Sequence, residues 1–471
     1  MPNDTHSTST TKGFLIAGLS GGSGKSVITV GITAALTSLG TTIAPFKKGP
    51  DYIDAGWLHL AANSPCYNLD PYLMGPELIY QSCSEHSTGK ELIVIEGNRG
   101  LFDGVNISGS YSSAELAAIL HLPVILVLDC TKMTRTAAAL LLGCVAMGTD
   151  ITIKGVVLNR IGSARHEKII RQAIEHYTDI AVVGAMPRLT YDIFPQRHIG
   201  ITPCQEYDGS RDALDDLTAL IKEHINLTAL VEMAEPFVPS STPAGIYQQC
   251  HNDDGTIVTI GVLKDAAFQF YYPENLTALE RCGATLVEIN ALTDNALPEI
   301  DGLYIGGGFP ETNVHGLSSN KAFKKSLKEK ISRGLPVYAE CGGLIYLGDS
   351  IEVNGEAYPL TGVFPASFAM QKKPQAHGYT ILTATAHNPI YPIGTRITGH
   401  EFRYSKVTNW PQESPELALT MERGTGFAEG KDGLVYKNVL ALYTHIHALS
   451  TPEWAPAFVA KIRQVKLSRD S

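Results

Sequence analysis

Short apolar runs alternate with longer segments of mixed polarity along the first half of the chain. The runs are rich in Val and Ile, and they occupy residues 13–19, 91–97, 123–129, 153–160 and 181–187. Runs that barely alternate between apolar and polar positions are typical of strands buried on both faces of a parallel sheet. Helix-like segments lie between them at 112–120, 136–147 and 167–176. This alternation predicts an α/β fold with a doubly wound parallel sheet.

A second α/β pattern follows a change in composition. Residues 233–256 carry three prolines, many small polar side chains and no clear period, which is typical of an interdomain linker. Beyond it, strands are expected at 256–263, 285–290, 302–307 and 335–340, and helices at 275–282 and 321–333. We therefore expect a disordered N-terminus over 1–12, a first domain over 13–232, a linker over 233–256 and a second domain over 257–465.

The composition supports two globular domains and excludes several classes of protein. Hydrophobic residues make up 44% of the 471 residues and charged residues 18%, which excludes a globally disordered chain. The net charge of -10 argues against a nucleic-acid partner bound through a dominant basic surface. The polar start MPNDTHSTSTTK lacks the apolar segment of a signal peptide, and the longest apolar stretch is too short to cross a bilayer. We expect a cytoplasmic protein without a membrane partner.

The cysteines do not form a recognisable framework. The chain has 8 of them, and no two are spaced as CxxC. A disulfide scaffold or a zinc ribbon is therefore not expected. The sequence leaves the oligomeric state open, with a homodimer among the alternatives.

A glycine-rich loop follows the first predicted strand and precedes a helix-like segment at 27–39. Backbone N–H groups of such a loop can surround a polyphosphate, and the start of a helix adds a favourable dipole. Lys25 can reach the β- and γ-phosphates, and the Ser26 hydroxyl can bind Mg²⁺. The sequence therefore predicts an ATP site with the residues Gly18, Ser20, Gly21, Gly22, Ser23, Gly24, Lys25 and Ser26.

The loop departs from the strict GxxxxGK[ST] pattern, because position 19 is Leu19 and the first glycine is Gly18. This longer spacing resembles the loops of dethiobiotin synthetase-type enzymes, which activate carboxylates. A flexible glycine-rich turn without a ligand is the alternative interpretation.

Acidic residues lie where parallel strands are expected to end. Glu96 ends one run, Asp129 ends another, and Asp51 and Asp54 follow the short run TTIAPF. Carboxylates at this edge face the ligand crevice of an α/β sheet, and Mg²⁺ prefers one or two of them together with phosphate oxygens. We expect Ser26, Asp51 and Glu96 to hold Mg²⁺. Solvated loop acids are the alternative.

The residues that follow the fourth predicted strand are candidates for the nucleotide base. Asn159 and Arg160 lie at the carboxyl end of that strand, where an adenine ring can reach them. We expect Asn159 to belong to the ATP site.

A cysteine in the second domain lies at a predicted strand-to-helix turn. The segment LPVYAECGGLIYL places Cys341 directly after a buried strand and before Gly342. Such an elbow exposes a nucleophile, the helix start lowers the pKa of a thiol, and a backbone N–H can stabilise an oxyanion. Gly342, Gly307 and Gly308 are the expected oxyanion donors. A buried cysteine without a catalytic role is the alternative.

A nucleophilic thiol needs a base, and the segment YTHIH near the C-terminus supplies candidates. The run VLALYTHI is strand-like, so His445 and His447 are expected on the same face. A metal site that uses both histidines is a weaker alternative, because the sequence places no third ligand near them.

Together these motifs resemble the cobyrinate a,c-diamide synthase family, which are glutamine-dependent tetrapyrrole amidases. The resemblance spans about residues 13–460, and the matching segments include KKGPDYIDAGW, EGNRGLFDG, LNRIGSARH, FYYPENL, GGGFPE, ECGGLIYL, GHEFRYS and YTHIH. It implies a P-loop synthetase domain over 13–232 and a class I glutamine amidotransferase-like domain over 257–465.

The resemblance also implies a mechanism. The first domain uses ATP and Mg²⁺ to phosphorylate a carboxylate of a tetrapyrrole polycarboxylate. In the second domain Cys341, assisted by His445, attacks L-glutamine and releases ammonia. Ammonia then displaces phosphate from the acyl-phosphate, along an enclosed route that keeps it unprotonated.

The family places further residues near the substrate. Asp51, Asp54 and Glu96 match acids used around Mg²⁺ and the phosphorylated intermediate, and Lys48 and Asp54 are expected at the intermediate or the substrate. Candidates for the tetrapyrrole pocket are Tyr271, Tyr272, His400 and Arg403.

The third member of the usual glutaminase triad is absent from its expected position. Larger amidotransferase families place a Glu two residues after the histidine, and here that position is His447. We predict a Cys–His pair without a third acid. Glu340 and Glu401 are open alternatives for that role.

Some segments depart from the sequences that are usual in the family. Asn98, Arg99, Lys132 and Arg135 stand where relatives commonly have other residues, and these departures resemble a branch found with dissimilatory sulfite reductase. Amidation of sirohaem or sirohydrochlorin is therefore an alternative to amidation of cobyrinate. A regulatory P-loop ATPase and a ligase acting on a different carboxylate are further alternatives.

Overall fold

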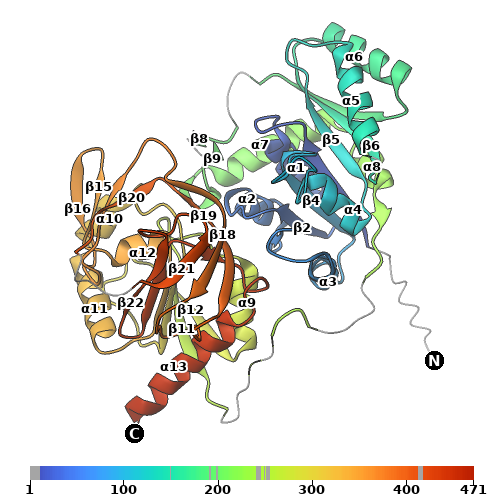
Figure 1. Cartoon of the computed structure of the whole chain (residues 1–471). Coiled ribbons are helices and arrows are strands. Elements are labelled where there is room, and N and C mark those ends of the chain that lie inside the picture. Colours follow the sequence, from blue (N-terminus) through green and yellow to red (C-terminus); the bar gives the residue numbers. More distant parts are fainter. Residues whose placement is uncertain are drawn as a thin grey trace, which may run out of the picture. The chain divides into compact units, whose positions relative to one another are not determined.

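The computed structural model describes residues 11–148, 150–189, 193–197, 200–239, 245–248, 250, 255–411 and 417–470. The chain forms two compact units, Met1–Ala244 and Gly245–Ser471, and each has a hydrophobic core of its own (Figure 1). Most of the segment expected to be disordered, residues 1–10, lies outside the described residues.

The first unit is built on a parallel sheet with strand order β3-β2-β4-β1-β5-β6-β7. Its strands are β1 (Lys12–Gly18), β2 (Ile43–Lys48), β3 (Tyr67–Leu69), β4 (Leu92–Gly100), β5 (Val124–Asp129), β6 (Ile153–Ile161) and β7 (Ala181–Pro187). The five predicted strands of this half are confirmed, and β1 lies at the centre. The loop that follows β1 is therefore held at the middle of the sheet edge.

The sequence missed β2 and β3, which extend one side of the sheet. Both are short, and the apolar run of β2 ends in two lysines, so neither reads as a buried strand. Two two-residue strands, β8 (Gln196–Arg197) and β9 (Gly200–Ile201), form a separate hairpin.

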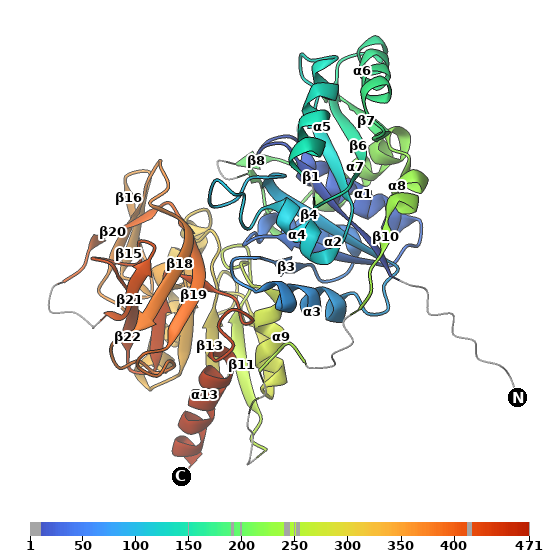
Figure 2. The ribbon, with the colours of Figure 1, turned by 45° about the vertical axis from the view of Figure 1, so that its right-hand side comes forward.

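Helices cover the sheet between successive strands. They are α1 (Lys25–Ser38), α2 (Ile53–Ala62), α3 (Pro76–His86), α4 (Ser113–Leu120), α5 (Thr136–Met147), α6 (Ala164–Tyr177), a 3₁₀ turn at Cys204–Glu206, α7 (Ser210–His224) and α8 (Leu227–Met233). Helix α1 packs against α2 and α7, and α5 packs against α6 (Figures 1 and 2). A Cβ atom at Gly31 would lie 2.6 Å from Cγ1 of Ile221, so glycine permits the close approach of α1 and α7.

The first part of the expected linker belongs to the first unit. Strand β10 (Glu235–Pro236) pairs antiparallel with β1, and the next residue, Phe237, is buried and donates from its backbone N–H to the Thr11 carbonyl. The first unit therefore continues beyond residue 233, where the linker was expected to begin, because two backbone pairings and one buried ring hold this segment to β1.

The second unit contains a mixed sheet with strand order β12-β11-β13-β14-β23-β22-β21-β18-β19-β24. Its parallel part comprises β11 (Val258–Leu263), β12 (Ala284–Ile289), β13 (Gly302–Ile305), β14 (Val337–Glu340) and β23 (Val439–Leu442). The antiparallel part comprises β18 (Ala376–Ala384), β19 (Arg396–Arg403), β21 (Leu417–Arg423), β22 (Lys431–Tyr436) and β24 (His445–Ile446). The four predicted strands are confirmed, and the antiparallel strands were not predicted.

In the described residues, a smaller sheet and five helices complete the second unit. The sheet has the order β16-β15-β17-β20, with β15 (Ser350–Val353), β16 (Glu356–Pro359), β17 (Ser367–Met370) and β20 (Ser405–Asn409). The helices are α9 (Pro273–Arg281), α10 (Val314–Ser319), α11 (Lys321–Ser332), α12 (Gly342–Leu347) and α13 (Trp454–Asp470). Helices α9 and α13 lie side by side (Figure 2). Within the described ranges, neither unit has a helix with the length and apolarity needed to cross a membrane.

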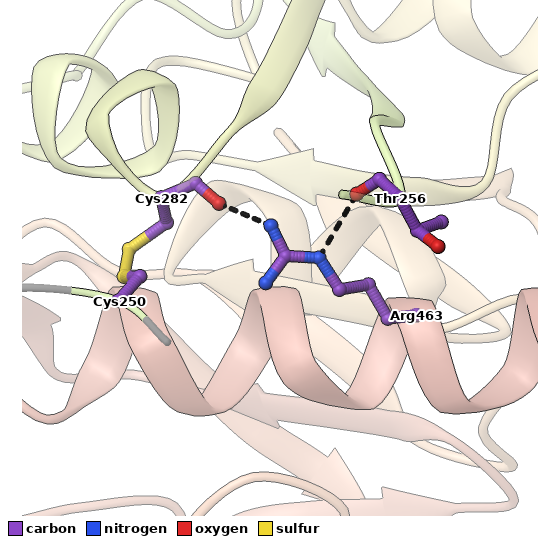
Figure 3. Close-up of a disulfide and its surroundings, with 4 residues drawn as sticks. All are labelled: Cys250, Thr256, Cys282 and Arg463. Carbon is purple, nitrogen blue, oxygen red and sulfur yellow. Dashed lines mark hydrogen bonds between the residues drawn. A yellow bond between two sulfur atoms is a disulfide. The ribbon is translucent and has the colours of Figure 1, made fainter. Parts of the chain in front are cut away.

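A disulfide and an arginine secure the start of the second unit (Figure 3). Cys250 is bonded to Cys282, which directly follows α9. Arg463 of α13 donates from Nη2 to the Cys282 carbonyl at 2.5 Å and from Nε to the Thr256 carbonyl at 3.1 Å. These contacts fasten the segment that enters the unit to two helices. A disulfide was not expected, because the spacing of the cysteines gave no sign of one.

Candidate active sites

The glycine-rich loop lies between β1 and α1, as the sequence predicted. Gly24 precedes the helix with φ 88°, and a Cβ atom there would lie 2.2 Å from Nδ2 of Asn159. The Asn159 amide donates to the Ser23 carbonyl at 2.8 Å. Glycine is therefore required at position 24 both by the backbone conformation and by the neighbouring amide. The start of α1, with Lys25 and Ser26, presents the positive end of the helix dipole beside this loop.

A cavity of about 630 Å³ opens at the loop. The loop, the carboxylates and the strand ends supply its polar wall, and the segment after β7 supplies apolar side chains. Its lining includes Gly22, Gly24, Lys25, Ser26, Asp51, Asp54, Asn159, Arg160, Pro187, Leu189, Ile193 and Phe194. A cavity with this volume and this mixture of polar and apolar groups suits a nucleotide.

A buried lysine joins the three acids that the sequence assigned to this site. Nζ of Lys47 lies 2.7 Å from Oδ2 of Asp54, 2.9 Å from Oε1 of Glu96 and 3.6 Å from Oδ2 of Asp51. The Ser26 hydroxyl lies 2.6 Å from Oε1 of Glu96 and 3.0 Å from Oδ2 of Asp54. The structure therefore brings Ser26 and the three acids together. Lys47 was not among the predicted site residues, although its place at the end of an apolar run was a signal.

The charges of this cluster do not balance. Burial lowers the pKa of Lys47, but Asp54 and Glu96 outweigh it, and the pKa lies well above its usual value. Burial, followed by the charge of Asp54, raises the pKa of Glu96 and of Asp51. Three carboxylates therefore surround one fully buried ammonium, with Lys25 3.5 Å from Oε1 of Glu96. An additional cation would stabilise the ionised acids.

The oxygen atoms of this cluster fit Mg²⁺. Oε2 of Glu96 is buried and accepts no hydrogen bond, so it is available as a ligand. Hydroxyl and carboxylate oxygens are the donors that Mg²⁺ prefers, usually with phosphate oxygens and waters in the remaining positions. In the part of the chain that the structure describes, no group of three His, Cys, Asp or Glu residues could hold a metal on its own. An ion here would therefore depend on the nucleotide as well as on the protein.

Other predicted residues of the first unit have different surroundings. Lys48 is mostly buried, and burial lowers its pKa, which Asp70 partly offsets. Asp129 accepts hydrogen bonds from Thr131 and forms an ion pair with Arg160. The carboxylate of Asp129, which was not among the expected Mg²⁺ ligands, is therefore used in a local turn.

Cys341 occupies the elbow that the sequence predicted. It follows β14 and precedes α12, with φ 47° and ψ -96°. A non-glycine residue with positive φ is strained, and such strain is frequent at functional sites. The residue is 8% exposed and therefore buried, at the edge of the core of the second unit.

The imidazole of His445 lies beside this thiol and beside a carboxylate. Burial lowers the pKa of His445, but the Cys341 charge and hydrogen bond, followed by those of Glu340, outweigh it and raise the pKa to about 10. Nδ1 of His445 lies 3.5 Å from Oε2 of Glu340. The expected Cys–His pair is therefore present in the geometry. The acid beside the imidazole is Glu340, which directly precedes the thiol and is one of the two alternatives left open for the third position.

The glycine loop between β13 and α10 packs against the histidine. A Cβ atom at Gly307 would lie 2.3 Å from Cε1 of His445, and one at Gly342 would lie 3.1 Å from the Gly308 nitrogen. The N–H of Gly306 donates to the Tyr271 hydroxyl at 2.8 Å. Because Gly306 is bonded in this way, Gly308 and Gly342 are the backbone donors best placed for an oxyanion, with Gly307 required for space.

The four residues proposed for a tetrapyrrole pocket lie inside the second unit. Tyr271 donates its hydroxyl to the Leu263 carbonyl and so anchors the glycine loop. Tyr272 is buried with its ring 4.6 Å from that of His447. Substrate contact by these two tyrosines stays a prediction, and the contacts above hold both side chains within the unit.

His400 and Arg403 also support the interior. The His400 ring stacks on the His445 ring with centroids 5.0 Å apart, and burial lowers the pKa of His400 well below its usual value. Arg403 lies 3.9 Å above the Tyr443 ring and donates to the carbonyls of Ser405 and Gly426 at 2.5 and 2.7 Å. A pocket role for these two residues stays a prediction. Both are buried and hold the strands around His445.

The two histidines of the YTHIH segment have different partners. β23 ends at Leu442, and the Asp432 carboxylate accepts the N–H groups of Tyr443 and Thr444 before β24 begins at His445. His447 lies 3.5 Å from Glu274 of α9. The expectation of one continuous strand is wrong, because a buried carboxylate takes the N–H groups that a strand neighbour would otherwise accept.

Two family descriptions match separate parts of the chain. Residues 14–197 match the CobQ/CobB/MinD/ParA nucleotide binding domain, and residues 259–453 match the CobB/CobQ-like glutamine amidotransferase domain. The first range contains the glycine-rich loop and its carboxylates, and the second contains the cysteine and its histidine.

Three similar proteins carry the same name, cobyrinate a,c-diamide synthase. That of Magnetococcus marinus is 40% identical over 442 residues, which cover 93% of this chain and 94% of that protein. That of Archaeoglobus fulgidus is 36% identical and covers 96% and 98%, and that of Dehalococcoides mccartyi is 38% identical and covers 95% and 97%.

Proposed function

The chain belongs to the cobyrinate a,c-diamide synthase family of glutamine-dependent, ATP-using ligases, and from this we propose that it converts side-chain carboxylates of cobyrinate into amides. The observation that carries the proposal is the presence, in one chain, of a nucleotide-type cavity lined by acids and of a thiol beside an imidazole.

The second unit would release ammonia from glutamine. The Cys341 thiolate attacks the side-chain amide carbon, and the Gly308 and Gly342 N–H groups stabilise the resulting oxyanion. His445 gives a proton to the departing nitrogen, which leaves as ammonia. Water then cleaves the thioester, giving glutamate and the free thiol. The raised pKa of His445 supports this role, because it keeps the imidazole protonated beside the thiolate at neutral pH.

The first unit would activate the acceptor. A carboxylate oxygen attacks the γ-phosphorus of ATP, ADP leaves, and an acyl-phosphate forms. Ammonia attacks the acyl carbon, phosphate leaves, and the amide remains. Lys25 and the loop hold the phosphates. We assign Lys48 to the carboxylate of the acceptor or to its phosphorylated form.

Mg²⁺ is part of the proposal for the first unit. Ser26, Asp54 and Glu96, with Asp51 close by, would hold it, and it would neutralise charge on the phosphates. The unpaired Oε2 of Glu96 and the excess of carboxylates support this assignment.

Product mass with several tetrapyrroles tests the proposal. The purified chain is given ATP, Mg²⁺ and glutamine with cobyrinate, sirohydrochlorin or sirohaem, and the mass change of each carboxylate-to-amide exchange is followed. Amidation of cobyrinate with matching release of glutamate, ADP and phosphate is expected. Amidation of sirohaem or sirohydrochlorin in preference to cobyrinate would overturn the substrate assignment. ATP hydrolysis without any amide product would favour the regulatory ATPase.

A further inference from the structure

Glu340 is a fully buried acid at the last position of a central strand. It ends β14, which lies between β13 and β23, and it is 1% exposed. An ionised carboxylate is costly to bury unless charged or hydrogen-bonding partners surround it. Its contacts therefore indicate why this strand ends in an acid immediately before the nucleophile.

The carboxylate contacts the segment that carries the histidine at two points. Oε1 accepts the backbone N–H of Ile446 at 3.3 Å, and Oε2 lies 3.5 Å from Nδ1 of His445. The first contact fixes the backbone of β24, and the second faces the ring. With Nδ1 turned toward the carboxylate, Nε2 is the ring nitrogen left for the thiol of Cys341.

A polar network orients the carboxylate from its other side. Nδ2 of Asn275 donates to the Tyr304 hydroxyl at 3.2 Å and to the Ile446 carbonyl at 3.0 Å, and its Oδ1 accepts the Ala448 N–H at 2.7 Å. Because Tyr304 accepts from Asn275, its own proton is directed to Oε2 of Glu340, 3.3 Å away. Asn275 and Tyr304 thus hold both the acid and the histidine segment.

We propose that Glu340 is the positioning acid of the glutaminase site, completing a Cys341–His445–Glu340 triad in which the acid directly precedes the thiol. This inference rests on the proposed function and adds a residue to its glutaminase step. The carboxylate holds the imidazole with Nδ1 protonated and stabilises the imidazolium that forms when the thiol ionises. No bond to Glu340 forms or breaks.

The chain supplies a matched control. Glu274 lies 3.5 Å from Nε2 of His447, and both side chains are fully buried. This second acid–imidazole pair is in the same unit and has the same separation, but it does not contact Cys341 or His445 in the contacts described above. Glu274→Gln therefore imposes a similar buried change without touching the proposed triad.

The experiment compares Glu340→Gln, Glu340→Asp and Glu274→Gln in the full chain. Glutamine hydrolysis gives kcat and KM, and the rate of iodoacetamide reaction with Cys341 against pH reports the thiolate fraction. For Glu340→Gln we expect kcat to fall about 10- to 1,000-fold with a smaller change in KM, and thiolate formation to move to higher pH. Glu340→Asp should restore part of both, and Glu274→Gln should leave the thiolate profile unchanged.

Unchanged kcat and an unchanged thiolate profile in Glu340→Gln would overturn the proposal. An equal shift of the profile in Glu274→Gln would also overturn it, since any buried acid would then suffice. Cys341→Ser is measured in parallel. If that variant still hydrolysed glutamine, the glutaminase assignment itself would fail, which is a different result from failure of Glu340 alone.

Tyr304→Phe keeps the test decisive if Glu340→Gln does not fold. This change removes one hydrogen bond to Oε2 and retains the ring packed against Tyr271 and Trp454. We expect kcat to fall about fivefold, with a shift of the thiolate profile in the same direction as for Glu340→Gln. A wild-type profile in Tyr304→Phe would count against the proposal.

Discussion

Lys47 and Lys48 are neighbours in the sequence but occupy opposite electrostatic environments. Lys47 is surrounded by three carboxylates, so its pKa is raised well above the usual value in spite of burial. Lys48 is mostly buried with fewer compensating charges, so its pKa is lowered. Because successive side chains of a strand point to opposite faces, a single step along β2 separates the two environments.

Replacing Lys47 tests how much its charge contributes to the stability of the acidic cluster. Lys47→Met leaves Asp54 and Glu96 buried without their main counter-charge, and we expect the free energy of unfolding to fall by about 3–5 kcal/mol. The loss should be smaller at pH 5 than at pH 8, because Glu96 and Asp51 have raised pKa values and protonate as the pH falls. Urea unfolding at both pH values measures the effect.

The control for this prediction is Lys48→Met. It removes a buried ammonium that is not joined to the acids, so a smaller loss of stability is expected. An equal or larger loss in Lys48→Met would contradict the role given to Lys47.

His445 links stability to pH in the second unit. Its pKa rises from 6.5 to about 10 in the folded chain, so the stabilisation is fully present below pH 6.5 and is lost as the pH rises through about 10. The stability of the wild type relative to His445→Gln should therefore shrink, on the order of a few kcal/mol, between neutral pH and pH 10. Urea unfolding at a series of pH values tests this, and a constant difference would refute it.

Among the elements, helices α4, α6, α8 and α11 begin at side-chain caps, whereas several others do not. Asn320 precedes α11, accepts the Phe323 N–H at 3.2 Å, and donates to the carbonyls of Ala291 and Asp294 at 2.9 and 2.8 Å. Helices α1 and α12, in contrast, begin without a side-chain cap, at Gly24 and Cys341. No capping side chain therefore competes with phosphate at the start of α1 or with an oxyanion at the Gly342 N–H of α12. The next N–H of α12, that of Gly343, donates to the Gly306 carbonyl.

The cap of α11 should contribute more than an ordinary one. Asn320→Ala removes one capping hydrogen bond and two hydrogen bonds to the carbonyls of Ala291 and Asp294. We therefore expect the free energy of unfolding to fall by about 2–3 kcal/mol. Ser163→Ala at α6, where the hydroxyl accepts the His166 N–H, should cost about 1 kcal/mol. Urea unfolding of both variants measures the two losses. A larger loss of unfolding free energy in Ser163→Ala than in Asn320→Ala would contradict the prediction.

At the scale of the whole molecule, two chemistries are carried by two units with separate cores. The first unit contains the nucleotide-type cavity, and the second contains the thiol, the imidazole and the acid. Because neither set of side chains draws on the other unit in the contacts described above, a substitution at one site should remove only its own step.

This separation predicts two opposite phenotypes. Cys341→Ser should abolish glutamine-driven amidation and leave ammonia-driven amidation within about threefold of the wild type, because the acyl-phosphate still forms. Lys25→Met should lower amidation from either nitrogen source by at least about 100-fold while leaving basal glutamine hydrolysis measurable. Amide product and glutamate are measured for each variant. Loss of ammonia-driven amidation in Cys341→Ser would show that the two steps are not separable.

The sequence by itself determined the two α/β units, the central place of the glycine-rich loop, and the elbow that carries Cys341. These features depend on local patterns: apolar runs, a glycine-rich turn before a helix, and a short strand ending in a small-residue turn. A pattern of this kind is readable because neighbouring residues produce it.

Only the tertiary structure decided which distant side chains meet. Lys47, Asp54 and Glu96 come from three elements, and Glu340 reaches His445 across a separation of about a hundred residues. It also showed that Tyr272, His400 and Arg403 are interior supports, because burial and stacking are properties of the packed chain. Strand order and packing decide such contacts, and a one-dimensional pattern does not contain them.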